Sequence, residues 1–132
     1  MKYMLDTDTC IYLIRNKSTK ALGKIKEALG DGIAISVITL AELEHGVQKS
    51  GNPGKNASAL AQMLIPITVL PFDAESAAEH GLIRNTLEKE GCVIGQMDML
   101  IAAHAKSAKL TIVTNNVQEF ERVEGLKLEN WV

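Results

Sequence analysis

The chain has 132 residues, of which 46% are hydrophobic, and its 16 acidic and 14 basic residues leave a formal net charge of −2. This length and composition exclude a fibrous or disordered protein and predict one globular domain over residues 1–132. The near-neutral charge argues against a generally basic nucleic-acid-binding protein. It does not exclude one, because four acids gathered around a metal would leave the rest of the chain at about −2 + 4 = +2.

The distribution of apolar residues and cysteines excludes further classes. No segment approaches the ~18 consecutive apolar residues of a membrane-spanning helix, and the first residues lack the long apolar run of a signal peptide. Cys10 and Cys92 are too few and too isolated for a disulfide framework or a zinc site. We therefore expect a cytoplasmic protein that does not enter a membrane.

Short apolar runs of strand length alternate with helical patterns along the chain. The predicted strands cover residues 3–5, 33–36, 67–70 and 110–113, with an additional edge strand near 126–128. Helices are predicted over about 7–15, 18–29, 37–49, 55–64, 74–90 and 97–108, with a short one around 119–120. Apolar strands separated by helices are typical of a parallel sheet covered on both faces. We therefore predict an α/β fold, a three-layer α/β/α sandwich with a mainly parallel sheet of four to five strands.

Four acids lie where a predicted strand ends or a helix begins. Asp6 ends the first strand and precedes Thr7 and Asp8, which are the better-placed caps of the first helix. The other three acids are Glu42, Asp98 and Glu119. The carboxyl ends of parallel strands meet at one edge of a sheet, so these acids can converge there. Carboxylates that repel one another need a counter-charge, and their hard oxygen atoms suit Mg²⁺ or Mn²⁺.

Each acid also has a purely structural explanation. Asp6 can serve only as a helix cap, Glu42 as a solvated residue, and Asp98 as a residue whose ionised form the helix N-terminus favours. Gly46 lies one turn after Glu42 and costs about 1 kcal/mol of helix stability relative to alanine, which suggests a close approach by another segment.

Basic residues of the second helix are the best candidate surface for phosphate contacts: Lys17, Lys20, Lys24 and Lys26. The three histidines lack metal-binding spacing and are assigned to packing or to the surface.

Four segments resemble the PIN-domain family and, within it, the VapC toxins of bacterial toxin–antitoxin pairs. They are residues 4–8 (MLDTD), 36–46 (SVITLAELEHG), 95–103 (GQMDMLIAA) and 113–120 (VTNNVQEF). Each segment is weakly specific alone, but together they occur in the family's order along nearly the whole chain. The resemblance implies the same α/β/α sandwich and a Mg²⁺- or Mn²⁺-dependent endoribonuclease that inhibits translation by cutting structured RNA.

The resemblance also implies roles for individual residues. Asp6 and Asp98 would bind the metal directly, and Glu42 would bind it or orient the attacking water. Thr114 and Asn115 would hydrogen-bond to Asp6 and position it.

The chain departs from the family pattern at one position. The fourth family acid falls at Asn116, so either Glu119 substitutes for that acid or Asn116 holds a metal-bound water. One bound metal or two are both compatible with this pattern. Asp8 is left as a helix cap or as a residue that supports the metal ligands.

The resemblance further implies a VapB-type antitoxin, whose C-terminal segment wraps the toxin and reaches into the acidic groove, often with a basic side chain. Homodimers are usual in the family, and DNA would be contacted only indirectly, through the antitoxin. Members of the enteric-type subgroup cut the anticodon loop of initiator tRNA, which makes that tRNA our hypothesis for the substrate.

Two alternative functions are compatible with parts of the sequence. The segment from Asp6 through Asp8 to Thr9 also fits haloacid-dehalogenase-type phosphatases, in which Asp6 would be the nucleophile. That alternative leaves Glu42 and Asp98 without roles. The other is a non-catalytic RNA- or protein-binding module on the same fold. Clustered carboxylates argue against it, because without a metal they repel both each other and RNA.

Overall fold

The computed structural model describes residues 1–16 and 19–132. Within these residues the strands form one five-stranded parallel sheet in the order β3-β2-β1-β4-β5. Their bounds are β1 Tyr3–Leu5, β2 Ile33–Ser36, β3 Thr68–Leu70, β4 Thr111–Val113 and β5 Leu128–Glu129. The predicted fold class is confirmed. Because β1 is the central strand, the residue that follows it, Asp6, lies at the middle of the carboxyl edge.

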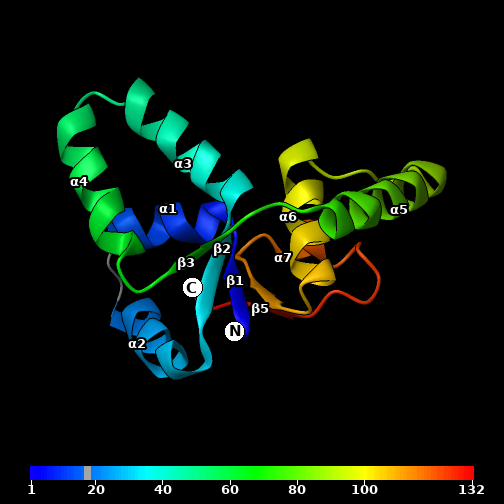
Figure 1. Ribbon diagram of the computed structural model, residues 1–132, viewed down its shortest axis with the longest axis horizontal. Helices are drawn as coiled ribbons and strands as arrows, with labels where there is room; N and C mark the ends of the chain where they lie inside the picture. Colours follow the sequence, from blue (N-terminus) through cyan, green and yellow to red (C-terminus); the bar gives the residue numbers. More distant parts are fainter. Residues whose placement is uncertain (17–18) are drawn as a thin grey trace.

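Helices cover both faces of this sheet (Figure 1). One layer consists of α1 Thr7–Asn16, α2 Thr19–Ala28, α3 Val37–Lys49 and α4 Pro53–Leu64. The other layer consists of α5 Ala74–Glu90, α6 Gln96–Ser107 and α7 Val117–Phe120. A 3₁₀ turn, η1 Leu29–Asp31, connects α2 to β2. None of the helices in the described residues has the length and apolar content needed to cross a membrane.

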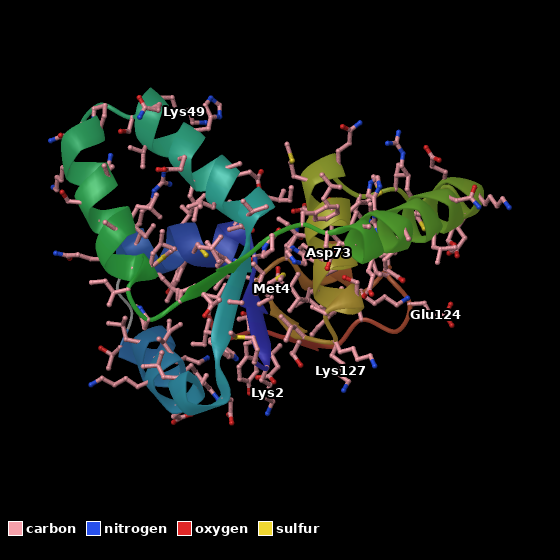
Figure 2. All side chains as sticks on the ribbon, viewed as in Figure 1. Lys2, Met4, Lys49, Asp73, Glu124 and Lys127 are labelled. Atoms are coloured by element: carbon pink, nitrogen blue, oxygen red, sulfur yellow. The ribbon has the colours of Figure 1, made fainter. Side chains whose placement is uncertain are left out.

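Alternate residues of each strand supply two separate cores. Tyr3 and Leu5 pack with Ile33 under the layer of α1 to α4. Met4 points to the opposite face and packs against α5, α6 and α7, and Figure 2 shows it among the side chains at the centre of the molecule. β1, β2 and β4 are buried on both faces, so their residues are mostly apolar and do not alternate with exposed polar residues. An unbroken apolar run was therefore the correct strand signal.

The element boundaries agree with the predicted ones within about two residues, and local capping explains the differences. α4 begins at Pro53, because Asn52 Oδ1 accepts a hydrogen bond from the N–H of Lys55 and a proline at the first helical position needs no N–H partner. α5 has its predicted cap, Asp73. It ends at Gly91, whose φ of 68° lies in the left-handed region that glycine adopts at low cost.

A buried polar contact joins the start of α3 to α6. Ser36 Oγ accepts a hydrogen bond from the N–H of Ile38, which caps α3, and lies 2.7 Å from His104 Nδ1. His104 is buried, as predicted for a packing histidine, and this burial lowers the pKa of its imidazole. Phe72 meets the imidazole edge-on, with 5.5 Å between ring centroids. The contact fixes the position at which α3, the helix that carries Glu42, leaves the sheet.

We predict that Ser36→Ala destabilises the protein by about 2–3 kcal/mol, because it removes a helix cap and leaves a buried imidazole nitrogen without a partner. The matched control is Asn52→Ala, an exposed cap that should cost about 1 kcal/mol or less. Urea unfolding followed by circular dichroism measures both values. Equal losses for the two variants would contradict a structural role for the Ser36–His104 contact.

Candidate active site

Asp6 is only 2% exposed, and both of its carboxylate oxygens accept hydrogen bonds. Oδ1 accepts from the backbone N–H of Thr9 at 2.8 Å, and Oδ2 accepts from the hydroxyl of Thr114 at 2.6 Å. Asp6 is therefore itself the N-cap of α1. The expectation that Thr7 or Asp8 caps this helix is wrong.

Thr114 has the positioning contact predicted for it, from the end of the neighbouring strand β4. Asn115, expected to assist, is exposed, and within the described residues only Thr9 and Thr114 donate hydrogen bonds to the Asp6 carboxylate. The pKa of Asp6 is raised overall, mainly by burial and also by the charge of Asp8. The hydrogen bonds from Thr114 and Thr9 oppose this rise. A buried carboxylate at a sheet edge with a perturbed pKa is a candidate functional group.

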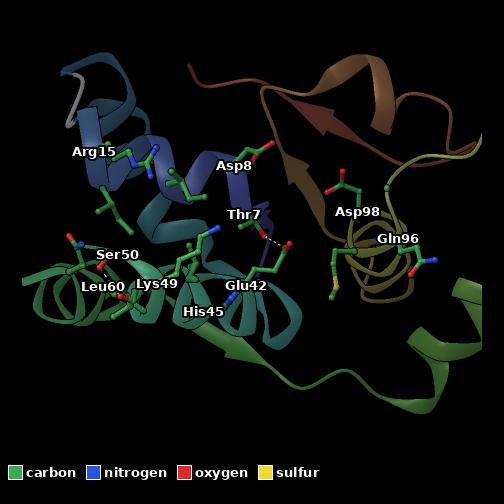
Figure 3. Close-up of a pocket in the computed structure, with 18 residues that line it drawn as sticks. Thr7, Asp8, Arg15, Glu42, His45, Lys49, Ser50, Leu60, Gln96 and Asp98 are labelled. Atoms are coloured by element: carbon green, nitrogen blue, oxygen red, sulfur yellow. Dashed lines mark hydrogen bonds between the residues drawn. The ribbon is translucent and has the colours of Figure 1, made fainter. Parts of the chain in front are cut away.

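Glu42 accepts a hydrogen bond from Thr7 of α1. The Thr7 hydroxyl donates to Glu42 Oε1 at 2.5 Å and lies 3.3 Å from the hydroxyl of Thr39 (Figure 3). Thr39 is fully buried and lies one turn before Glu42 in α3, so the three side chains hold the first turn of α1 against the first two turns of α3. The sequence analysis missed this contact. The only available signal was the i, i+3 spacing that places Thr39 and Glu42 on one helix face.

Asp98, in the first turn of α6, interacts directly with Glu119 of α7. Burial, followed by the neighbouring carboxylates of Glu119, Asp6 and Asp8, raises the pKa of Asp98 to about 7. These effects outweigh the helix N-terminus, which was expected to favour the ionised form. The pKa of Glu119 is lowered, mainly because Glu119 accepts a hydrogen bond from Asp98. The two neighbouring carboxyl groups therefore differ in pKa, with Asp98 the weaker acid.

Asn116 lies where the family resemblance implies an acid, and its side chain supports Glu119. Asn116 Nδ2 donates to Glu119 Oε2, and the backbone N–H of Asn116 donates to Thr114 Oγ1 at 2.8 Å. The backbone of Gly95 also hydrogen-bonds to Glu119 and contributes to its lowered pKa. A β-carbon at Gly95 would lie 3.3 Å from Asp98 Oδ2, so the missing side chain leaves room for that carboxylate. Glu119 is thus held toward Asp98 by an amide and a backbone N–H.

A cleft of about 670 Å³ opens beside these acids, between α1, α3, α4 and the start of α6 (Figure 3). Thr7, Asp8, Glu42 and Asp98 line one part of it. The remainder of the lining includes apolar and basic side chains, namely Ile11, Ile14, Arg15, Leu43, His45, Val47, Lys49 and Leu60, together with the neutral polar residues Ser50, Asn56 and Gln96. Asp98 therefore lines the cleft close enough to Glu119, Asp6 and Asp8 for these carboxylates to raise its pKa, and Glu42 faces the same cleft from α3.

Comparison with known proteins identifies the fold family. The PIN domain family model matches residues 3–126. This chain belongs to the PIN-domain family. A ribonuclease VapC2 of Haemophilus influenzae is 42% identical to this PIN-domain chain, over 100% of this chain and 99% of the relative. A tRNA(fMet)-specific endonuclease VapC of Shigella flexneri is 42% identical over 99% of this chain and 98% of the relative.

Solved structures support the same placement. VapBC2 from Rickettsia felis, bound to a DNA fragment from its promoter, superimposes with a TM-score of 0.97 at 39% identity and covers all of both chains. DNA-bound VapBC from Salmonella typhimurium gives a TM-score of 0.96 at 39% identity, over 100% of this chain and 99% of the other. The resemblance to the VapC ribonucleases of the PIN-domain family is therefore confirmed.

PIN-domain ribonucleases generally depend on a divalent metal, and the side chains at this edge fit one. In the part of the chain that the structure describes, no three His, Cys, Asp or Glu side chains already surround a single metal position. However, Asp6, Asp8 and Glu119 are close enough to Asp98 for their charges to raise its pKa. No Lys or Arg in the same described residues forms an ion pair with them. Unpaired carboxylates of this kind are the donors that hard divalent cations take.

The raised pKa of Asp98 predicts the pH dependence of the metal-free protein. The folded state keeps a proton on Asp98 up to about pH 7, whereas the unfolded chain releases it near pH 4, so stability should fall as the pH rises through this window. Asp98→Asn should remove much of this slope and stabilise the protein at pH 7.5 by on the order of 1 kcal/mol, after allowance for solvent screening.

The measurement is thermal unfolding in EDTA between pH 5 and pH 7.5, where 1 kcal/mol corresponds to about 3–6 °C. Asp31→Asn, in the 3₁₀ turn η1 at the other end of β2, is the matched control and should leave the slope unchanged. An Asp98→Asn protein with the same pH slope as the parent chain would contradict the raised pKa of Asp98.

Proposed function

We propose that this protein is a divalent-metal-dependent endoribonuclease, the toxin of a type II toxin–antitoxin pair, and that it inhibits translation by cutting structured RNA. One observation carries the proposal. Carboxylates that follow β1 (Asp6) and β4 (Glu119, in α7) lie beside one cleft with those of the second turn of α3 (Glu42) and the first turn of α6 (Asp98), and no described ion pair neutralises them. Mg²⁺ or Mn²⁺ fits this all-oxygen set of donors. The VapC ribonuclease relatives support the reaction class.

The acids have different proposed roles. Asp6 and Asp98 are the proposed direct ligands, and Glu119, held by Asn116, is the proposed third acid in place of the missing family residue. A bound Mg²⁺ or Mn²⁺ would stabilise the charge on the scissile phosphate and lower the pKa of an attacking water. Asp8, exposed in the first turn of α1, adds negative charge that strengthens cation binding.

Glu42 is the proposed group that orients the attacking water. Its Oε1 is already engaged by the Thr7 hydroxyl, which leaves Oε2 to accept a hydrogen bond from the water and to take up its proton. Thr7 and Thr39 then act as positioning residues, because they fix the direction of the Glu42 carboxylate. Asn115 contributes nothing to Asp6 and has no place in this mechanism.

The proposed partners and substrate are taken from the names of the relatives. Two relatives, from Shigella flexneri and Salmonella typhimurium, are tRNA(fMet)-specific endonucleases, so the proposed substrate is initiator tRNA, cut in its anticodon loop. The structural neighbours are VapBC complexes, which supports a VapB-type antitoxin as inhibitor, DNA contact through that antitoxin only, and a homodimeric toxin. A cytoplasmic location belongs to the same proposal.

The two alternative functions are not favoured. A haloacid-dehalogenase-type phosphatase would use Asp6 and Asp8, but it gives no role to Glu42 and Asp98, which line the same cleft. A non-catalytic binding module would have no use for neighbouring acids that raise the pKa of Asp98 to about 7.

We predict that the purified chain cleaves initiator tRNA with Mg²⁺ or Mn²⁺, and that EDTA abolishes the cleavage. Asp6→Asn and Glu42→Gln should each lower kcat/KM by about 100-fold or more, because they remove a metal ligand and the water-orienting carboxylate. Glu44→Gln, on the exposed side of the same helix α3, is the matched control and should retain activity. Cleavage that persists both in EDTA and in Asp6→Asn would refute the metal mechanism, and hydrolysis of p-nitrophenyl phosphate would revive the phosphatase.

We further predict that Thr7→Val lowers kcat by about 10–100-fold with little change in KM, because Glu42 loses the donor that orients it. Thr7→Ser keeps a hydroxyl and should restore most of the rate. Thr86→Val, an exposed threonine of α5, is the control for the loss of a hydroxyl elsewhere. If Thr7→Ser is as slow as Thr7→Val, the methyl group and not the Thr7–Glu42 hydrogen bond is what matters.

A further inference from the structure

The two walls of the cleft carry the same charge pattern. On α1, Asp8 lies at the acidic end and Arg15 follows seven residues later, while on α3 Glu42 is followed seven residues later by Lys49. Seven residues are about two helical turns, or ~10.5 Å along each helix, so each acid and its cation share one face. Figure 3 shows Arg15 on the side of the cleft away from Asp98, and Figure 2 places Lys49 at the end of α3 remote from the sheet.

Neither cation is neutralised by a neighbouring acid. The ion pairs found within residues 1–16 and 19–132 are Arg84–Glu88 and Lys106–Glu79, both on the α5–α6 side, so Arg15 and Lys49 have no carboxylate partner among the described residues. Both side chains are exposed and line the cleft together with His45, one turn before Lys49 on α3. Free cations near an acidic site can attract an anion of the substrate.

Apolar side chains and one glycine separate the two ends. Ile11, Leu43 and Leu60 form part of the lining from three different helices. Gly46 lies on α3 between Glu42 and Lys49, and a β-carbon there would have no neighbour within 4 Å. The close approach of another segment expected at Gly46 is therefore absent from the described structure. Instead, the missing side chain keeps the middle of the cleft open.

We propose that Arg15, His45 and Lys49 form a phosphate-binding subsite for the RNA strand, about two helical turns along the cleft from the metal-binding acids. The inference rests on the proposed ribonuclease function. An RNA strand carries one negative charge per nucleotide, so a strand with its scissile phosphate at the acids must place further phosphates along the cleft. The guanidinium of Arg15 and the ammonium of Lys49 supply the positive charge that those phosphates require. The subsite fixes the direction in which the strand crosses the cleft.

This subsite differs from the basic surface that the sequence suggested. Lys20, Lys24 and Lys26 are exposed on α2 but do not line the cleft, and Lys17 lies outside the described residues. Arg15 and Lys49 are separated by more than thirty residues and become neighbours only because α1 and α3 pack side by side. A run of lysines was visible in the sequence, whereas this pair was not.

An acidic peptide segment is the competing occupant of the basic end. RNA is favoured because an acid and a cation lie seven residues apart on both walls. Every nucleotide of an RNA strand carries a phosphate, so one phosphate can lie at the metal-binding acids while another lies at the cations. A peptide that filled the whole cleft would need a basic side chain at the metal-binding acids and an acidic side chain about two helical turns further along, at Arg15 and Lys49. The experiment below separates the two occupants.

The test compares Arg15→Gln/Lys49→Gln with Lys24→Gln/Lys26→Gln, a control that removes two exposed charges from α2. For cleavage of initiator tRNA, the cleft variant should raise KM by about tenfold while kcat changes by less than about twofold. The slope of log(kcat/KM) against log[KCl] should become shallower by about 1.4, that is, about 0.7 for each lost phosphate contact on a single strand. The α2 control should match the parent chain in all three values. Unchanged KM and salt slope in the cleft variant would overturn the subsite and leave the ribonuclease proposal standing.

A binding measurement keeps the two proposals separable. In an Asp6→Asn background with Mg²⁺, fluorescence anisotropy of labelled tRNA should show the same loss of affinity and of salt slope for the cleft variant. If the parent chain cleaves no RNA but this binding difference is present, the proposed function fails and the subsite stands. If the cleft variant binds tRNA normally and loses only the binding of a poly-glutamate peptide, the basic end is a peptide site and the subsite proposal is overturned.

Discussion

The buried carboxylate of Asp6 is the group on which the active edge depends. It accepts one hydrogen bond from the N–H of Thr9, in the first turn of α1, and one from the hydroxyl of Thr114, the residue that follows β4. A single side chain therefore connects the central strand, the first helix and the neighbouring strand. These two bonds partly offset the cost of burying a carboxylate, and the rest of that cost appears as its raised pKa. The aspartate is at once a helix cap and a candidate metal ligand.

Around Asp6 the fold brings like charges together and leaves them without ion pairs. Because β1 lies between β2 and β4, the segments after these three strands converge, and they carry Asp6, Glu42 and Glu119. Asp98 joins them from the first turn of α6. Their mutual repulsion contributes, after burial, to the raised pKa of Asp98. A site that is strained in this way without a cation gains stability when a cation binds, which is the electrostatic basis of a preorganised metal site.

Neutral hydroxyl and amide groups set the directions of the acids. Thr114 holds Asp6, Thr7 holds Glu42, and Asn116 holds Glu119. Each donor leaves the charge on its carboxylate intact, whereas a lysine or arginine partner would neutralise it. The cations that line the cleft, Arg15 and Lys49, lie instead about two helical turns along α1 and α3 from Asp8 and Glu42. This separation of charge along α1 and α3 lets one groove hold a cation at one end and attract phosphate at the other.

The sequence by itself determined the elements, the fold class, the family and the acids, because apolar runs, caps and short motifs are local patterns. It could not decide which residue caps α1, because Asp6, Thr7 and Asp8 are all good caps. In the folded chain, Thr114 lies beside β1 and donates a hydrogen bond to Asp6, whose other carboxylate oxygen caps α1. The tertiary structure alone paired Thr7 with Glu42 and placed Arg15 opposite Lys49. Such contacts join residues more than thirty positions apart, and helix packing, which no local periodicity encodes, decides their distance.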